Sequence, residues 1–305
     1  SVRKVGVSAF ENCSGLNSAS VLGELEVLEE RAFYGCTNLN KVRMDKVREA
    51  GKDVFTDTGV SKKVLLAIIS LDNTDKIIDF IRRDDLNEKE MTELWVELSK
   101  RFIEESKGIA WSREGEIYWG FDESKGRLIL KGVGQIEDYA NGGRTCKMQD
   151  YGNAPWVQRH GNQIQSVVVC YGISSIGQNT FSNCTSLKSV ITPCSVTSIG
   201  NYAFYNCNAL TSVTIPTSVI SIGDYAFCGC TSLKSVVIPD SVASIGGYAF
   251  YNCNALTSVT IPKSVTSIGD WAFYSCNNLK TVTIPSGLNY SSGVFNGSNP
   301  AITKY

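Results

Sequence analysis

The residue types that most often carry out chemistry are few and isolated in this 305-residue chain. Its single histidine, His160, lies in a polar segment, and no nucleophile or acid accompanies it in the sequence. Cys228-x-Cys230 is spaced too closely for a zinc site, and no other ligand stands near it. Gly132-x-Gly134 lacks the strand-loop-helix context of a phosphate-binding loop. None of these residues predicts a catalytic centre.

Charged side chains are sparse in the second half of the chain, where nearly all of them are Lys188, Asp224, Lys234, Asp240, Lys263, Asp270 and Lys280. Paired carboxylates for acid–base catalysis are therefore absent from this half. An enzyme would need a carboxylate pair or a metal site within residues 61–163. We expect no catalytic activity, no cofactor and no bound metal.

Aromatic residues recur at two fixed positions around a repeated phenylalanine. They are Tyr202, Tyr225, Tyr248 and Trp271, two residues before it, and Tyr205, Tyr251 and Tyr274, one residue after it. One structural repeat per step would stack these rings into ladders along one edge. The ladders could simply pack neighbouring turns together, or they could form a flat aromatic strip for a protein or glycan ligand. These seven residues are the candidate partner-binding site.

The elements that position these rings repeat with a period of 23 residues. Six residue types recur at fixed positions of this repeat. They are isoleucine followed by glycine, then phenylalanine, cysteine, leucine, valine and proline: Ile176, Ile199, Ile222, Ile245 and Ile268; Phe181, Phe204, Phe227, Phe250 and Phe273; Cys184, Cys207, Cys230, Cys253 and Cys276; Leu187, Leu210, Leu233, Leu256 and Leu279; Val190, Val213, Val236, Val259 and Val282; and Pro193, Pro216, Pro239, Pro262 and Pro285. A fixed period with fixed apolar positions indicates a solenoid.

One repeat is too small to fold alone. The apolar side chains of residues 219–239 contribute about 10–18 kcal/mol on burial, whereas ordering the residues costs on the order of 30 kcal/mol. Stacking must therefore supply the difference. Residues 210–216 alternate like a short strand that proline ends, and residues 224–228 have helical or 3₁₀ character. We expect parallel strands about 4.8 Å apart.

The pattern V-x-x-I-G-x-x-A-F-x-x-C-x-x-L-x-x-V-x-I-P over residues 176–300 resembles the BspA-type leucine-rich repeat. The resemblance implies a right-handed leucine-rich-repeat solenoid of the α/β class with 23-residue coils. It also implies a bacterial protein that is secreted or attached to the cell surface, and that adheres to a host extracellular matrix protein or glycan. The alternative is a structural spacer that presents another domain at the cell surface. We expect a monomer.

Residues 1–60 carry the same repeat in degenerate form. Phe10 and Phe33 keep the period, whereas Phe55 arrives one residue early and Thr58 replaces the cysteine. Because Ser1 falls where a preceding strand should end, we expect the protein to extend upstream. A signal or anchor would then lie outside this chain.

Residues 61–107 predict a small helical unit. Asn87 and Glu90 resemble a capping box, and Met91, Leu94, Trp95, Leu98 and Phe102 follow on one helical face. Residues 64–69 and 77–81 are shorter amphipathic segments. The unit would cap the N-terminal repeats or, alternatively, bind a partner helix.

Residues 108–163 predict a β-hairpin module, with strands at 117–121 and 127–130 around a turn at 122–126. The hairpin, Gly132-x-Gly134 and Ala154-Pro155-Trp156 resemble the short module that precedes BspA-type arrays. It would cap the C-terminal array of residues 164–305. After Pro285 the last repeat degenerates, with Phe295 one residue early and a final strand expected at 301–304.

The whole-chain properties exclude two partners. A net charge of −1 gives no field that attracts nucleic acid, and no run of about 20 apolar residues predicts membrane insertion. For the cysteine column we expect free thiols rather than disulfides, because parallel side chains keep Cβ atoms about 4.8 Å apart, slightly too far for a bridge.

Overall fold

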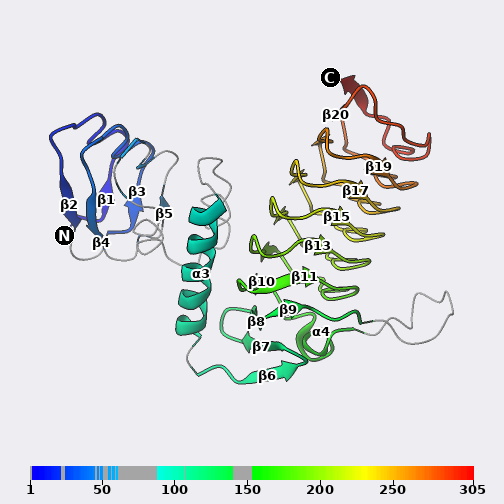
Figure 1. The fold of residues 1–305 in the computed structure, drawn as a ribbon, viewed down its shortest axis with the longest axis horizontal. Helices are drawn as coiled ribbons and strands as arrows, with labels where there is room; N and C mark the ends of the chain where they lie inside the picture. The colour runs from blue at the N-terminus through cyan, green and yellow to red at the C-terminus, as the bar shows by residue number, and fades with distance from the viewer. Residues whose placement is uncertain are drawn as a thin grey trace. The chain divides into compact units, whose positions relative to one another are not determined.

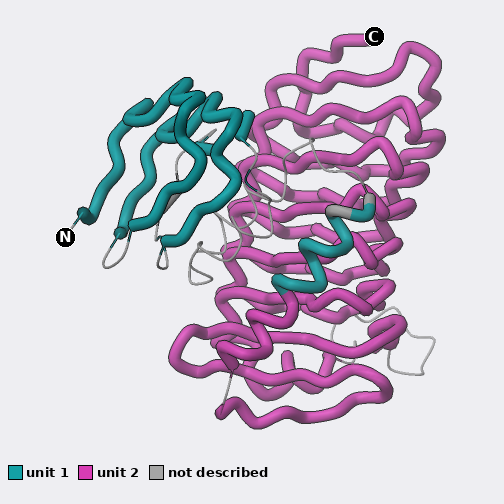
Figure 2. The backbone as a smooth tube through the Cα atoms, turned by 60° about the vertical axis from the view of Figure 1, so that its left-hand side comes forward, with its two compact units in different colours: residues 1–98 teal, residues 99–305 magenta. Residues whose placement is uncertain are grey.

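The structure is a computed structural model that describes residues 2–21, 25–44, 47, 49–50, 54–55, 57–58, 60, 88–106, 108–139 and 153–305. The chain divides into two compact units, residues 1–98 and 99–305 (Figure 2). Each unit is described by itself. The domain boundaries expected at residues 60, 107 and 163 stay predictions.

Unit 2 contains the long array, in which each coil contributes two short strands. The first strands are β10 (Ser166–Val169), β12 (Ser189–Ile191), β14 (Ser212–Thr214), β16 (Ser235–Val237), β18 (Ser258–Thr260) and β20 (Thr281–Ile284). The second strands are β11 (Ile173–Ile176), β13 (Ser198–Ile199), β15 (Ser221–Ile222), β17 (Ser244–Ile245) and β19 (Ser267–Ile268). Figure 1 shows the coils stacked in one direction. The predicted solenoid is confirmed.

The strand register follows the sequence period. Val213 lies between Val190 and Val236 in a parallel ladder, and Ile199 pairs with Ile222 in the second sheet. Each strand of the array is only two to four residues long, so a single coil cannot form a sheet of its own. Neighbouring coils therefore supply the hydrogen bonds that a single coil lacks.

The interior is built from the repeated columns. Phe204, Phe227 and Phe250 are fully buried and stack with ring centroids 5.1 and 5.2 Å apart. Four thiols of the cysteine column, those of Cys207, Cys230, Cys253 and Cys276, each donate a hydrogen bond to the carbonyl of the phenylalanine one coil earlier, as Cys230 does to Phe204 at 3.3 Å. The ten cysteines that the structure describes are free thiols. The column's cysteine side chains thus fill the core as small apolar groups and also hydrogen-bond one coil to the next.

The loop after each second strand is a series of turns and not the expected helical turn. In the coil of Tyr225, the N–H groups of Tyr225 and Phe227 donate to carbonyls of the next coil, whereas that of Ala226 donates back to Gly223. Successive amides therefore alternate between the coil's own turns and the neighbouring coil. This alternation prevents a continuous helix, whose amides would all point along one axis.

The hairpin module closes the N-terminal end of the array. Strands β6 (Trp111–Glu114), β7 (Ile117–Asp122) and β8 (Arg127–Gly132) are antiparallel, and β8 pairs in parallel with β10. β9 (Gly134–Gln135) extends the second sheet. Helix α4 (Pro155–His160) starts with proline at its first position, as helices favour. Its Trp156 is fully buried and donates from Nε1 to the Thr180 carbonyl at 2.9 Å, and thus joins the module to the array.

The C-terminal end is closed by an atypical coil. Phe295 stacks on Phe273 at 5.6 Å despite arriving one residue early, and β21 (Ala301–Lys304) pairs in parallel with β20. The predicted final strand is confirmed.

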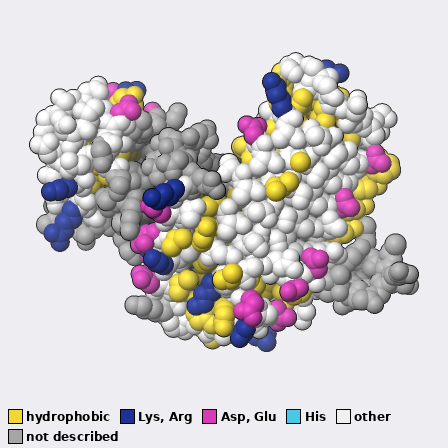
Figure 3. All heavy atoms as spheres, viewed as in Figure 1, with side chains coloured by type: hydrophobic (Ala, Val, Ile, Leu, Met, Phe, Trp, Pro, Cys, Tyr) yellow, Lys and Arg dark blue, Asp and Glu magenta, His cyan; other side chains and the backbone are white. Residues whose placement is uncertain are grey.

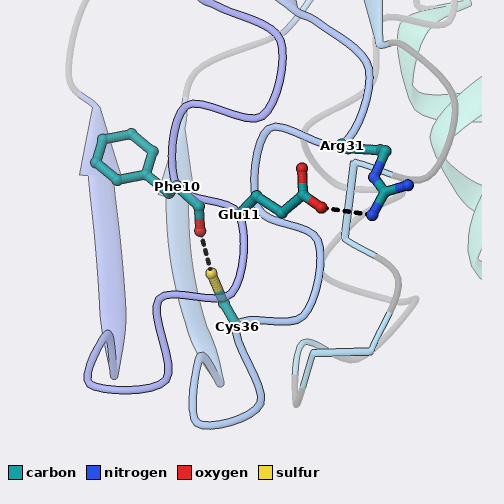
Figure 4. Close-up of polar contacts among 4 residues, drawn as sticks. All are labelled: Phe10, Glu11, Arg31 and Cys36. Atoms are coloured by element: carbon teal, nitrogen blue, oxygen red, sulfur yellow. Dashed lines mark hydrogen bonds and ion pairs between the residues drawn. The ribbon is translucent and has the colours of Figure 1, made fainter.

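Unit 1 contains the degenerate repeats. Its strands are β1 (Lys4–Val5), β2 (Ser18–Val21), β3 (Val27–Leu28), β4 (Lys41–Met44) and β5 (Glu49–Ala50), and they form sheets β1-β3-β5 and β2-β4. Phe33 stacks between Phe10 and Phe55 at 5.1 and 5.2 Å. Cys36 donates to the Phe10 carbonyl at 2.8 Å, and Arg31 forms an ion pair with Glu11 (Figure 4). The phenylalanine stack and the hydrogen bond from cysteine to a phenylalanine carbonyl therefore occur in unit 1 as well as in unit 2.

Helix α3 (Glu88–Glu105) buries the predicted face, with Leu94, Trp95, Leu98 and Phe102 each at most 4% exposed. In its C-terminal half, Phe102 lies under the Arg127 guanidinium, 5.3 Å from ring centroid to Cζ. Asn87 and the segments 64–69 and 77–81 lie outside the described residues, so the capping box and the two shorter helices stay predictions.

Candidate functional site: an aromatic ladder

The four aromatic residues that precede the core phenylalanines form one stacked ladder. Tyr202 and Tyr225 have ring centroids 4.7 Å apart with planes 4° from parallel, and Tyr225 and Tyr248 are 4.5 Å apart at 8°. Trp271 follows on Tyr248 at 5.1 Å with a tilt of 31°. The ladder expected from the 23-residue spacing is therefore present.

The second aromatic column joins this ladder at its sides. Tyr205 meets Tyr202 edge-on at 5.6 Å, Tyr251 meets Tyr248 at 5.7 Å, and Tyr274 stacks on Tyr251 at 5.5 Å. Cys228 occupies the missing position of the column between Tyr205 and Tyr251 and is buried. All seven predicted residues consequently belong to one aromatic cluster. We call its continuous stack of Tyr202, Tyr225, Tyr248 and Trp271 the aromatic ladder.

The backbone of the ladder is unusual for such large side chains. Tyr202, Tyr225, Tyr248 and Trp271 have φ angles of 57°, 55°, 56° and 56°. This left-handed conformation suits glycine and asparagine, and it costs most other residues about 1–2 kcal/mol. It accompanies a hydrogen bond to the next coil, since the N–H groups of the three tyrosines donate to carbonyls there, as Tyr202 does to Asp224 at 2.9 Å.

Two positions per coil take this conformation, and the chain fills them differently. Two residues after the core phenylalanine, the left-handed residues are all small or polar: Asn12, Gly35, Asp57, Asn183, Asn206, Gly229, Asn252, Ser275 and Gly297. Two residues before it, they are Ser8, Arg31 and Asn179 in three coils and the four ladder aromatics in four others. The backbone thus permits asparagine or serine at the ladder positions, and it does not itself require aromatic rings there.

The ring faces of the ladder are covered by each other. Tyr225 and Tyr248 are each stacked on both sides, and a Cβ placed on Gly293 would lie 3.1 Å from Nε1 of Trp271. The expected flat strip of ring faces is therefore not what the ladder presents. Solvent reaches ring edges and hydroxyl groups instead, most of all at Trp271, which is 39% exposed.

Carboxylates border the ladder, and they were not among the predicted site residues. Asp224 and Asp270 immediately precede Tyr225 and Trp271, and both are exposed. Asp224 Oδ1 accepts a hydrogen bond from the Gly247 N–H at 2.7 Å, which fixes the side chain beside the rings. Their position could have been found in the sequence, because the residues before the four ladder aromatics form the column Asn201, Asp224, Gly247 and Asp270.

Burial raises the pKa of Tyr225 to about 12, so its hydroxyl stays protonated at neutral pH.

The other candidate residues have structural surroundings. His160 stacks on Phe121 with centroids 4.3 Å apart, and its Nδ1 lies 3.3 Å from Gln163 Oε1. Burial raises the pKa of the Cys228 thiol to about 12. Within the part of the chain that the structure describes, no group of three potential metal ligands occurs and no helix could cross a membrane.

The protein-family sequence model of the BspA type leucine rich repeat region matches this chain in six copies, over residues 1–73, 159–219 and 197–304. No curated protein matches the chain.

Several solved structures are similar to parts of the chain. A leucine-rich repeat protein from Eubacterium ventriosum is 31% identical over 58% of this chain and 44% of its own, with a TM-score of 0.48. One from Bacteroides ovatus is 20% identical over 99% of this chain and 57% of its own, with a TM-score of 0.46. The chain therefore spans about half the length of these two proteins. A leucine rich cell surface protein from Faecalibacterium prausnitzii is 18% identical over 98% of this chain and 74% of its own, with a TM-score of 0.40. The repeat columns and the matched family model together show that this chain belongs to the BspA-type leucine-rich repeat family.

Proposed function

We propose that this protein is a non-catalytic adhesion protein of a bacterial surface or secretome. It binds a host extracellular protein or glycan through the repeated surface of its array, with the aromatic ladder at the centre of the contact. Family membership supports the surface location.

The observation that carries this proposal is the choice of side chains at the left-handed positions. Tyr202, Tyr225, Tyr248 and Trp271 occupy sites where Ser8 and Asn179 serve the same backbone in other coils. Each stacked pair contributes about 0.5–1.5 kcal/mol beyond area burial, so three pairs contribute about 1.5–4.5 kcal/mol, against a left-handed cost of about 4–8 kcal/mol for four residues. Coil stability alone is therefore a weak reason to keep four aromatic rings here, whereas tyrosine and tryptophan are the residues enriched in binding surfaces.

The repetition of the surface also favours binding. Tyr202–Pro216 and Tyr248–Pro262 are identical in sequence, so two coils share surface residues as well as core residues. A copied surface adds equivalent contacts along one partner and raises avidity without new chemistry. An active site gains nothing from such copying.

A direct binding screen tests the proposal. The chain is immobilised and exposed to fibronectin, fibrinogen, collagen, mucin and a panel of polysaccharides. In the test variant the four ladder residues, Tyr202, Tyr225, Tyr248 and Trp271, are changed to Asn, which the chain itself uses at left-handed positions. Both substitutions remove the stacked ring, but asparagine tolerates the left-handed backbone conformation better than alanine does.

The matched control is Val237→Thr, which lies on the strand surface and is 65% exposed. Thr214 and Thr260 occupy the same column in neighbouring coils, so this change preserves the fold. We expect saturable binding to a panel member that the ladder variant loses and the control keeps. Binding that the folded ladder variant retains would refute the ladder as the contact surface, and no binding by any protein would favour the spacer function.

A further inference from the structure

The edge of the array that carries the aromatic ladder has a distinct charge. Its loops, residues 200–209, 223–232, 246–255 and 269–278, contain the acidic residues Asp224 and Asp270 and no lysine or arginine. Figure 3 shows hydrophobic and acidic side chains along the loop edge of the array, on its right-hand side. We call this surface the loop edge.

The lysines of the same coils lie elsewhere. Lys188, Lys234 and Lys280 are exposed and stand immediately before strands β12, β16 and β20. The two coils that carry Asp224 and Asp270 therefore have a lysine, Lys234 or Lys280, before the first strand and a carboxylate in the loop. A cationic ligand would be repelled from the strand side and attracted to the loop edge.

The ladder restricts the ligand further. Between Asp224 and Asp270 the rings of Tyr225 and Tyr248 are covered on both faces, so a sugar ring cannot stack on them. What remains are ring edges and hydroxyl oxygens beside carboxylates. Phenol and carboxylate oxygens accept hydrogen bonds from ammonium and guanidinium groups.

The spacing of the two carboxylates matches an extended polypeptide. Asp224 and Asp270 are two coils apart, which corresponds to about 9.6 Å at about 4.8 Å per coil. Three residues of a polyproline II segment advance about 9.3 Å and return the side chain to the same face, whereas in a β-strand the fourth side chain would point to the opposite face. Basic side chains three residues apart would therefore reach both carboxylates while the intervening chain lies along the ring edges.

We propose that the loop edge binds an extended basic segment of a partner polypeptide, with lysine or arginine side chains three residues apart at Asp224 and Asp270. This inference rests on the proposed adhesive function and names its ligand class. A glycan that stacks on the rings is the outcome that the covered ring faces disfavour.

Fluorescence anisotropy with labelled synthetic peptides tests this inference on the full chain. One peptide carries arginines three residues apart in a Gly/Ser/Thr background, a second carries the same arginines five residues apart, and a third has glutamine in place of arginine. The test variant is Asp224→Asn combined with Asp270→Asn. The control is Asp240→Asn, which removes an exposed charge from a different column.

We expect the first peptide to bind more tightly than the other two, and added salt to weaken its binding. An exposed ion pair contributes about 0.2–1 kcal/mol, so losing two carboxylates should lower affinity about 2- to 30-fold. The control should bind within about twofold of the parent, because Asp240 follows strand β16 and lies outside the loops that carry the ladder.

Equal affinity of the double variant and the parent, or equal affinity for the arginine and glutamine peptides, would overturn the inference. The adhesive function fails separately, when the parent chain binds no member of the screen. Ladder-dependent binding of a neutral glycan would support the adhesive function and refute the basic ligand.

Discussion

The left-handed backbone at Tyr225 makes a quantitative prediction about two substitutions. Tyr225 stacks on Tyr202 and Tyr248 at 4.7 and 4.5 Å, and its φ is 55°. Replacing the ring by either alanine or asparagine removes two stacked pairs, which costs about 1–3 kcal/mol. Alanine still carries the left-handed cost of about 1–2 kcal/mol, whereas asparagine carries less of it. Tyr225→Asn should therefore be more stable than Tyr225→Ala by about 1 kcal/mol.

Urea and thermal unfolding of the two variants measure this difference. For a folded unit of this size, 1 kcal/mol corresponds to about 2–4 °C in Tm. Tyr205 provides the matched comparison, since it lies in the same aromatic cluster but is not among the residues with positive φ. There the advantage of asparagine over alanine should vanish.

The reasoning is refuted when Tyr225→Ala is as stable as Tyr225→Asn. It is also refuted when asparagine is favoured equally at Tyr205, because the preference would then have nothing to do with φ. Either result would remove the argument that aromatic rings are kept at these positions against the backbone's own preference.

Three further predictions concern the interior of the array. Phe227→Ala should destabilise unit 2 by about 3–5 kcal/mol, because a fully buried ring with two stacking neighbours is lost. Phe295→Ala, which removes a ring with one phenylalanine neighbour, should cost less free energy of unfolding in the same urea titration. Equal losses would contradict the stabilising role of the phenylalanine stack. Gly223→Ala places a Cβ 2.6 Å from the backbone nitrogen of Asn201 and should lower the free energy of unfolding by at least about 1–3 kcal/mol. Gly287→Ala places a Cβ with nothing within 4 Å and should leave thermal unfolding unchanged. Similar effects of the two changes would contradict the close approach of neighbouring coils at Gly223. Burial raises the pKa of Cys184 from 9.0 to about 12. Its thiol ionises in the unfolded chain first, so the stability it contributes is complete below about pH 9 and falls by up to about 1.4 kcal/mol per pH unit above it. Urea titrations across this range in reductant should show a shallower decline for Cys184→Ala, and an unchanged slope would exclude the thiol as a cause.

Much of the fold was predictable from the sequence because it follows from one-dimensional spacing. A residue that recurs every 23 positions in a stacked chain must meet its own copies, so the stacks of Phe227 on Phe204 and Phe250 follow directly. The hairpin at 117–130 and the final strand at 301–304 were equally predictable, since alternation and turn residues act locally.

The details of the site were less predictable, because they depend on where each amide points. Asn206 and Gly229 mark one left-handed position by their residue types. The other position is filled by Tyr202 and Tyr225, residues that disfavour positive φ, so propensity predicts a helical turn there. Only the hydrogen bond from Tyr225 N–H to the next coil explains the conformation, and this bond is a property of the stack. Covered ring faces follow from the same geometry and could not be inferred from ring identity.

The core and the surface charges of the array repeat with different periods, and this difference bears on the proposed function. Core residues such as Phe227 and Cys230 recur in every coil, because each coil must cover its neighbour. The surface charges recur in every second coil, as Asp224 and Asp270 do on the loop edge, and as Lys188, Lys234 and Lys280 do on the strand side. Packing does not require a two-coil period, since a charge at an exposed position contributes little to stability. A two-coil spacing of about 9.6 Å does suit a partner that is itself extended and repeats every few residues. Lengthening the array by two coils would then add one carboxylate in register with the existing pair, and affinity would increase with array length through avidity while the fold stayed the same.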